Sequence, residues 1–431
     1  MAVSCVLAKD YLRTILNYTM PLASRLVAAA VRTARPILFW THLAVGVAAG
    51  AVILVMSVTG VLLTYQKQMT AWADLRDLDG APPAASAAAL PPDSLIARLR
   101  QQEPALAAAA VTSIVWRRAA DAPVELVLPQ GQRRFLNAYT GEVLGSGSAR
   151  MRAVFRVATD WHRWLARSGP SRTTGRAITG ASNIAFLLLA LSGFWLWWPR
   201  TWTRATFRNV LRFRRGLSPK ARDFNWHHVI GFWSLAPLVI IIASGVVISY
   251  PWASDLVYRV AGEAPPRREA SREASREGSR AANDAAPSPS RAVGLERVAL
   301  ARELAAARMP DWRTMSVTMP RSASAPLTLT VDRGMGGEPH KRAQIVVDSL
   351  HTPPRWQGFA EQSRARRWRS LLRFAHTGEV LGVAGQTLAG LLSLGSAILV
   401  YTGLALSWRR LRAFMRRSRD RNAHHDISAL L

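Results

Sequence analysis

The stretch Asn225-Trp226-His227-His228-Val229-Ile230-Gly231-Phe232-Trp233 decides the fold of this 431-residue chain. It places histidine at the mouth of an apolar run, roughly Val229 to Trp252, that contains no charged residue. A run of about 20 apolar residues is long enough to cross a bilayer as a helix. Histidine at such a position is costly and is usually functional. The stretch therefore predicts a membrane helix that carries a functional imidazole.

An earlier segment of the chain repeats this pattern. His42 precedes Gly46 by four residues and Gly60 by eighteen, and the same two spacings follow His227. The neighbouring His228 is offset by one residue from this match, so His227 is the predicted counterpart of His42 and His228 stays an alternative ligand. We interpret the match as an internal repeat that carries the chemistry of the protein.

Composition favours a membrane protein over a nucleic-acid-binding protein. The formal net charge is +29, yet 49% of the residues are hydrophobic. The basic residues avoid four long apolar runs and fill the segments between them, and no nucleic-acid-binding motif is present. The single cysteine, Cys5, excludes an internal disulfide, an iron–sulfur cluster held by cysteines, an all-cysteine zinc site and c-type haem attachment.

The predicted fold is an all-α transmembrane four-helix core with a two-fold internal repeat and two small α+β domains outside the membrane. The predicted spans are residues 38–65, 177–199, 227–253 and 380–408. The basic segments are an N-terminal cytoplasmic or interfacial segment (1–37), a loop (200–226) and a C-terminal tail (409–431). The positive-inside rule places all three, and hence both termini, in the cytoplasm.

The two long loops, 66–176 and 254–379, then lie on the outer side of the membrane. The first loop predicts a short helix from Pro92 and strands near 111–116, 124–128 and 134–138. The second predicts a helix near 295–307 and strands near 316–319, 327–331 and 345–348. A Ser/Arg/Glu/Ala-rich stretch, 267–291, predicts a disordered linker before that helix.

Two further histidines precede the second and fourth spans. These spans share matching glycines, and His162 and His376 lie just before them, although the spacing of each histidine to the first matched glycine differs. Topology then sorts the four histidines by side. His42 and His227 fall at the cytoplasmic ends of their spans, and His162 and His376 fall at the outer ends.

Paired histidines on facing helices at one membrane depth are what bis-histidine haem ligation requires, because each neutral imidazole supplies one axial nitrogen. Glycines one turn from His42 and His227 leave room for a flat porphyrin, and arginines such as Arg163 or Arg35 can pair with its propionates. The structural alternative is an interfacial or hydrogen-bonded histidine at each position. A zinc site is disfavoured because no cysteine or acidic cluster completes a tetrahedral set.

The sequence resembles the PepSY-associated transmembrane helix proteins, iron-regulated proteins of the bacterial inner membrane that include ferric-siderophore reductases of the FoxB type. The resemblance covers roughly residues 38–410. It is carried by Asn225-Trp226-His227, Ser249-Tyr250-Pro251-Trp252, His376-Thr377-Gly378-Glu379, Gly385-Gln386, Thr402-Gly403 and Trp197-Trp198-Pro199-Arg200. It implies two b-type haems, two PepSY-like periplasmic domains and reduction of a periplasmic ferric chelate. By motif position it implies His42, His162, His227 and His376 as haem ligands, whereas the family's usual asparagine after the third histidine is His228 here.

These observations predict an oxidoreductase of the inner membrane that binds two haem b groups and reduces a ferric siderophore from Fe³⁺ to Fe²⁺. No nucleotide-binding or flavin motif is present, so the electrons come from an external donor, either a cytoplasmic reductase or membrane quinol. The alternative is a non-redox PepSY membrane protein that regulates or binds an extracytoplasmic protease or another partner, with structural histidines. A siderophore transporter subunit is disfavoured because broken helices and an intramembrane charged site are missing.

Overall fold

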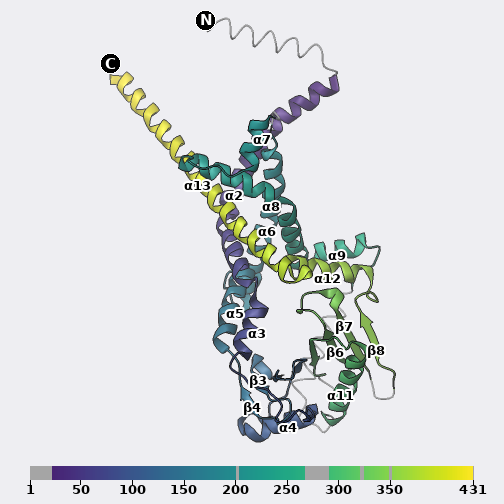
Figure 1. Cartoon of the computed structure of the whole chain (residues 1–431). Helices are drawn as coiled ribbons and strands as arrows, with labels where there is room; N and C mark the ends of the chain where they lie inside the picture. Colours follow the sequence, from purple (N-terminus) through teal and green to yellow (C-terminus); the bar gives the residue numbers. More distant parts are fainter. Residues whose placement is uncertain (1–21, 200–202, 267–290, 321–324, 349–351, 431) are drawn as a thin grey trace. The chain divides into compact units, whose positions relative to one another are not determined.

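The computed structural model describes residues 22–199, 203–266, 291–320, 325–348 and 352–430 (Figure 1). Most of the N-terminal segment and nearly all of the linker predicted at 267–291 lie outside these residues. The chain divides into two compact units. Unit 1 comprises the residues up to Ser57, Ala181–Val239 and the residues from Leu394 onward. Unit 2 comprises Val58–Gly180 and Ile240–Ser393.

Four helices in the described part of the chain are long and apolar enough to cross a membrane. They are α2 (Leu22–Leu63), α6 (Arg172–Trp197), α8 (Pro219–Ser249) and α13 (Gly382–Leu430). The number of spans predicted from the apolar runs is therefore confirmed. Each of these helices contributes residues to both units.

Helix boundaries extend beyond the apolar runs because backbone hydrogen bonding continues where hydropathy falls. Helix α8 begins at Pro219, a residue that favours the first turn of a helix, rather than at the predicted residue 227. His227 therefore lies well inside the helix and not at its mouth. Helix α13 continues past the predicted end at residue 408 into the basic tail.

The two long loops of the chain together form one antiparallel eight-stranded sheet in unit 2, with the order β4-β3-β2-β1-β5-β6-β7-β8. The first loop contributes β1 (Ser113–Arg117), β2 (Val124–Val127), β3 (Arg133–Leu136) and β4 (Val143–Gly145). The second contributes β5 (Thr314–Thr318), β6 (Leu327–Asp332), β7 (Arg342–Val347) and β8 (Arg355–Gly358). The sequence predicted two small domains, whereas β1 and β5 pair directly, with Ser113 opposite Thr318 and Arg117 opposite Thr314.

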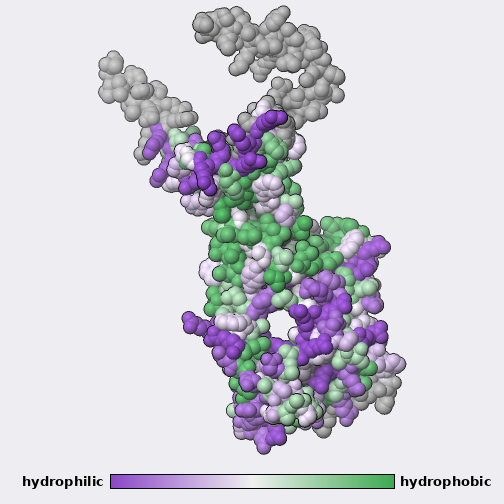
Figure 2. Space-filling model, viewed as in Figure 1, coloured by the Kyte–Doolittle hydropathy of each residue, from purple (hydrophilic) through white to green (hydrophobic). Residues whose placement is uncertain are grey.

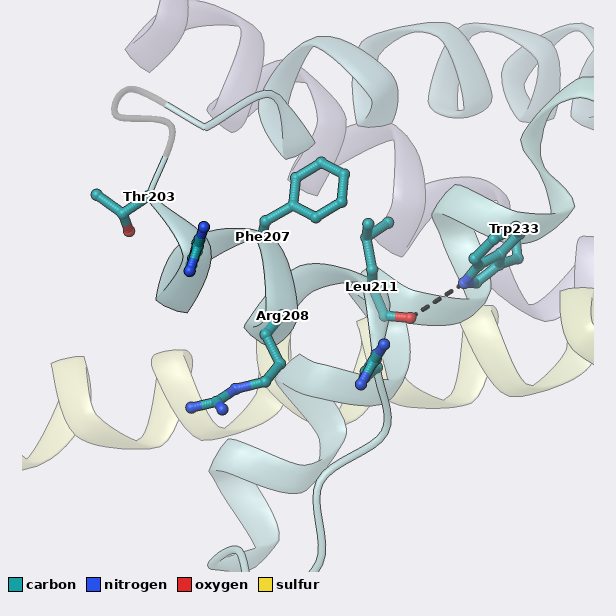
Figure 3. A pocket seen from close by; sticks show the side chains of 7 residues that line it. Thr203, Phe207, Arg208, Leu211 and Trp233 are labelled. Atoms are coloured by element: carbon teal, nitrogen blue, oxygen red, sulfur yellow. Dashed lines mark hydrogen bonds between the residues drawn. The ribbon is translucent and has the colours of Figure 1, made fainter.

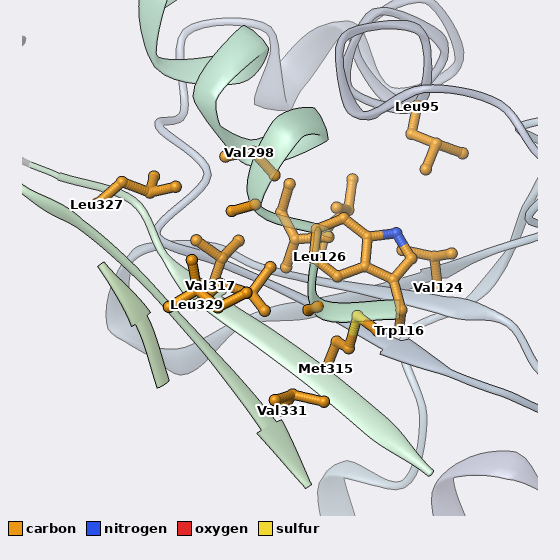
Figure 4. Packing of buried hydrophobic residues seen from close by; sticks show 14 of the residues in the cluster. Leu95, Trp116, Val124, Leu126, Val298, Met315, Val317, Leu327, Leu329 and Val331 are labelled. Carbon is orange, nitrogen blue, oxygen red and sulfur yellow. The ribbon is translucent and has the colours of Figure 1, made fainter. Parts of the chain in front are cut away.

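One hydrophobic core joins the two loops and explains why they share a sheet. Alternate residues of the central strands point to the same side, so Ile114, Trp116, Met315 and Val317 are buried together. Helices α4 (Pro92–Gln102) and α11 (Arg291–Arg308) bring apolar residues onto that core. Figure 4 shows Leu95 of α4 and Val298 of α11 near the strand residues. A lone four-stranded sheet would leave this face half covered.

Two amphipathic helices of unit 2 were not predicted, and both carry a candidate histidine. Helix α5 (Ala149–Trp164) contains His162, and helix α12 (Arg364–His376) ends at His376. Their basic residues keep them below any hydropathy threshold, but each has a serine N-cap: Ser148 accepts from the amide of Met151, and Ser363 accepts from that of Arg366. Shorter helices α3 (Gln66–Leu75), α7 (Arg204–Leu211) and α9 (Pro251–Val260) complete the described helices of more than one turn.

Candidate functional site

The four predicted histidines fall into two pairs, one in each unit. His42 on α2 and His227 on α8 belong to unit 1, and His162 on α5 and His376 on α12 belong to unit 2. All four side chains are half-buried. The two pairs of histidines that the predicted topology places on the two sides of the membrane are therefore the same pairs that fall in the two units.

The imidazoles of His162 and His376 face each other in unit 2. Their ring centroids lie 6.4 Å apart and their planes are inclined by 60°. Two imidazole nitrogens that share one metal ion at about 2 Å each put the ring centroids about 6 Å apart. The observed separation is thus compatible with one metal ion held between the two rings.

A hydrogen bond fixes which nitrogen of His376 is available for coordination. Nδ1 of His376 lies 2.9 Å from the carbonyl oxygen of Ile241, and Ser244 Oγ lies 3.5 Å from the same nitrogen. A carbonyl oxygen only accepts, so Nδ1 carries the proton and donates it, and Nε2 bears the lone pair. Burial lowers the pKa of His376, with the Ile241 carbonyl opposing this shift and Arg373 adding to it. The ring is therefore neutral near pH 7, the form that binds a metal ion.

The Nδ1 atom of His162 also has a hydrogen-bond partner, which in this case is a hydroxyl. Nδ1 of His162 lies 3.0 Å from Oγ1 of Thr59, on the α2 helix. With Nδ1 engaged, coordination by His162 would use Nε2. A hydrogen-bonded Nδ1 orients the ring and sets its tautomer, which is how metal-ligating histidines are usually supported.

The pair in unit 1 has matching supports. Nδ1 of His42 lies 2.8 Å from Ser192 Oγ, and Nδ1 of His227 lies 3.0 Å from Thr402 Oγ1. Ser192 donates its own proton to the carbonyl of Leu189 at 3.3 Å, which leaves its oxygen to accept from His42.

Each of these hydroxyl residues is followed by a glycine, and three of these glycines lie against an imidazole. A Cβ added at Gly193 would lie 3.4 Å from Cε1 of His42, and one added at Gly403 would lie 3.4 Å from Cε1 of His227. At Gly60 the added atom would lie 3.7 Å from Cε1 of His162. The missing side chains leave room beside the rings, as a flat ligand would need.

The glycines that the sequence had placed one turn from His42 and His227 have a different role. A Cβ at Gly46 would meet Leu189, and one at Gly231 would meet Leu399, both at ordinary van der Waals distances. These glycines are helix-packing positions. The hydroxyl-glycine pairs around the histidines were missed as supports, although the sequence shows them as Thr59-Gly60, Ser192-Gly193, Ser244-Gly245 and Thr402-Gly403.

Unit 2 also gathers positive charge beside its histidine pair. Burial, and then the charges of Arg176, Arg373 and Arg172, lower the pKa of Arg163. The positive charges of these arginines act on Arg163, although Arg172 also pairs with Asp160 at 3.2 Å, and an anion near them would be stabilised. Arg35, the other arginine considered for propionates, instead donates 2.9 Å hydrogen bonds to the carbonyls of Leu196 and Trp198 at the end of α6.

The imidazole of His228, the alternative ligand, makes its contacts with Phe224 in the same helix. Its Nδ1 lies 3.0 Å from the carbonyl of Phe224, and its ring centroid lies 4.0 Å from that of Phe224. His340 is exposed, as expected for a surface residue. His351, His424 and His425 lie outside the side chains that the structure describes. Within the described residues no three His, Cys, Asp or Glu side chains come together, so each histidine pair is a two-ligand arrangement.

Four apolar helices, two pairs of histidines whose Nδ1 atoms are hydrogen-bonded, and one sheet built from the two long loops define a multi-span membrane protein with a helical core. The chain belongs to the PepSY-associated TM region family, which matches residues 39–410. No curated protein matches the sequence significantly.

The histidine pairs fit a haem group. Each of the three glycines leaves space that a Cβ would fill beside a ring, Nε2 is the nitrogen that would coordinate iron because Nδ1 is hydrogen-bonded, and the arginines near His162 suit carboxylates. His42 and His227 would hold one group, and His162 and His376 would hold the other. When bound, haem supplies an iron centre that accepts and donates single electrons.

Proposed function

We propose that this chain is a di-haem b oxidoreductase of the bacterial inner membrane that reduces a ferric siderophore on the periplasmic side. The observation that carries the proposal is the His162–His376 pair, with centroids 6.4 Å apart and Nδ1 of His376 donating to a carbonyl. Family membership alone identifies the chain as a PepSY-associated membrane protein. The geometry of the histidine pairs supports the further proposal of a redox function.

In this proposal the histidine pair of unit 1 holds the electron entry site and the pair of unit 2 holds the exit site. His42 and His227 would hold the haem on the cytoplasmic side, where electrons enter, and His162 and His376 would hold the haem at the exit site near the periplasm. In this orientation unit 2, with its sheet, faces the periplasm and both termini face the cytoplasm, as the basic segments indicate. The electron donor is a cytoplasmic reductase or membrane quinol.

The substrate is a ferric iron bound by hard oxygen ligands. One electron converts Fe³⁺ to Fe²⁺, a softer ion that such a chelate holds less tightly, and the metal is released. The guanidinium groups of Arg163, Arg172, Arg176 and Arg373 favour an anion near the exit site. They would attract an anionic chelate or pair with the propionates of the outer haem.

The matching supports of the four histidines also favour the proposed two-fold repeat. In unit 2 the hydroxyls of Thr59 and Ser244 lie within hydrogen-bond distance of Nδ1 of His162 and His376, respectively. In unit 1 the hydroxyls of Ser192 and Thr402 lie within hydrogen-bond distance of Nδ1 of His42 and His227, respectively. Two copies of a helix-pair unit would produce this arrangement. The two sheet halves that meet at β1 and β5 would then be the PepSY-like domains of the two copies.

The test is to purify the full chain in detergent and to record reduced-minus-oxidised spectra with haem quantified per chain. The proposal expects two b-type haems, one remaining in His42→Ala and one remaining in His376→Ala. His376→Ala should also abolish reduction of an added ferric chelate. Retained reduction by a His376→Ala protein with one haem would refute the exit site. Absence of haem after expression with ample haem would favour a non-redox protein whose sheet binds a partner.

A further inference from the structure

A pocket in unit 1, outside the histidine pairs, has the chemistry of a lipid site. It has a volume of about 580 Å³ and is lined by residues of α7, its flanks and Trp233 of α8. Helix α7 lies between α6 and α8 in the chain, and Trp233 lies near the start of the uncharged run of α8 at Val229, so the pocket lies near the level where the apolar runs of two membrane-spanning helices end. That level of a membrane protein is the interface with lipid headgroups.

The basic side of the pocket is supplied by three arginines. Arg204, Arg208 and Arg212 recur every four residues along α7 and its C-terminal flank, and all three are exposed. No carboxylate of the described residues forms an ion pair with any of them, in contrast to nearby Arg222, which pairs with Asp223. Three guanidinium groups spaced one turn apart form a site for an anion with several oxygen atoms, such as a phosphate.

The apolar side of the pocket is supplied by Phe207, Leu211 and Trp233. Figure 3 shows Arg208 extending in a different direction from Phe207, and it shows the hydrogen bond that joins Trp233 to α7. In that bond the Trp233 indole N–H donates to the carbonyl of Leu211 at 3.1 Å. Phe207 is 46% exposed and Trp233 is 66% exposed, an unusual exposure for aromatic side chains in water but an ordinary one beside acyl chains.

The two sides together select an amphiphilic anion. A soluble anion would use the arginines and leave the aromatic side chains exposed to water, whereas a neutral lipid would leave the arginines without counter-charge. Figure 2 shows hydrophilic residues beside α7 and hydrophobic residues along the spanning helices of the same unit. An anionic phospholipid has the matching order, with a phosphate above an acyl chain.

We propose that this pocket binds one anionic phospholipid, with its phosphate held by Arg204, Arg208 and Arg212 and the start of its acyl chain against Phe207 and Trp233. The lipid would fix α7 against α8 at the membrane surface. This proposal does not rest on haem binding or on the proposed redox function, because none of the four candidate haem ligands lines the pocket.

The experiment is native mass spectrometry of the delipidated full chain in detergent, titrated with phosphatidylglycerol. The wild type should bind one molecule well above the affinity for phosphatidylcholine. The triple variant Arg204→Gln, Arg208→Gln, Arg212→Gln should lose on the order of a hundredfold in affinity, since each basic residue at an anionic lipid contributes about fivefold. The matched control removes the same charge outside the pocket, as Arg214→Gln, Arg215→Gln, Lys220→Gln, and should change affinity less than about threefold by loss of general attraction.

Two further measurements test whether the lipid binds in the pocket. They distinguish this from general attraction to the basic surface and from binding of a free anion. Trp233→Ala should weaken phosphatidylglycerol binding, and inorganic phosphate at equal concentration should fail to displace the lipid. Equal losses in the two triple variants would show that the attraction is spread over the basic surface and would overturn the pocket. Displacement by inorganic phosphate, or equal binding of phosphatidylcholine, would overturn the choice of an anionic lipid. The far-UV circular dichroism spectrum and thermal midpoint of the triple variant, compared with those of the wild type, show whether the variant has folded.

Discussion

The hydroxyl of Thr402 lies 3.0 Å from Nδ1 of His227 and donates its own proton to the carbonyl of Ile398 at 2.8 Å. A hydroxyl has one proton, so its oxygen must accept from His227. Nδ1 of His227 therefore carries the proton and Nε2 bears the lone pair. A side chain on α13 thus sets the tautomer of a histidine on α8, within one unit of the chain.

Replacing Thr402 with valine should weaken haem binding at His227 without removing the ligand. Loss of such a supporting hydrogen bond usually costs about 10–100-fold in affinity for the bound metal group. The measurement is haem retained per chain during dilution, together with the electron paramagnetic resonance signal of the oxidised protein, which reports imidazole orientation. Thr402→Ser keeps the hydroxyl and should resemble the wild type. Identical behaviour of the valine and serine variants would contradict the assigned role.

Replacing Gly193 with alanine should disturb the haem that we propose is held by His42. The new methyl group would lie 3.4 Å from Cε1 of the His42 ring and would fill the space beside it. We expect a changed spectrum or loss of one b haem. Gly46→Ala is the matched control on α2, since its methyl group would meet only Leu189 at 3.8 Å. Equal spectra for both variants would show that Gly193 leaves no functional space.

Replacing Leu126 with alanine should destabilise unit 2 through its core. Leu126 is fully buried on β2, and removing its side chain leaves a cavity that costs about 2–5 kcal/mol. The thermal midpoint of unit 2, followed by tryptophan fluorescence, should fall by roughly 5–20 °C. Leu304→Ala on α11 makes the same chemical change at a residue that is 37% exposed, and it should shift the midpoint far less. A similar shift in both variants would argue against a hydrophobic core that includes Leu126.

Sequence reasoning identified the spans and the four histidines because both leave local signals. An apolar run of membrane length and a repeated spacing are visible without any tertiary contact, as at His42 and His227. Strands β2 and β6 were predicted because alternation is also local. The pairing of β1 with β5 was not predicted, since it joins residues about two hundred positions apart that no periodicity links.

The supports of the histidines were missed for a related reason. Ser192 and Thr402 look like ordinary polar residues of a membrane helix, and their role depends on which ring faces them. Helices α5 and α12 were missed because basic amphipathic helices resemble loops in a hydropathy profile. Their serine caps, Ser148 and Ser363, were the available sequence signals.

The N-terminus of α12, which ends at His376, should loosen in acid because a carboxylate holds it. Glu263 accepts from the Ser363 hydroxyl at 2.6 Å and from the Ala365 amide at 3.1 Å. These bonds, the Ser363 hydroxyl first, lower the pKa of Glu263 below its ordinary value of 4.5. A lowered carboxyl pKa means that the stabilisation is complete above pH 4.5 and is lost as the pH falls through the folded-state pKa.

Hydrogen–deuterium exchange of the first turn of α12, corrected for the intrinsic pH dependence of exchange, should therefore rise below pH 4.5 in the wild type. Glu263→Gln cannot ionise, so its corrected exchange should be higher at pH 7 and nearly independent of pH across this window. Glu361→Gln, a carboxyl three residues before the start of α12, controls for general loss of negative charge and should keep the wild-type profile. A wild-type profile in Glu263→Gln would show that another group holds the helix that carries His376.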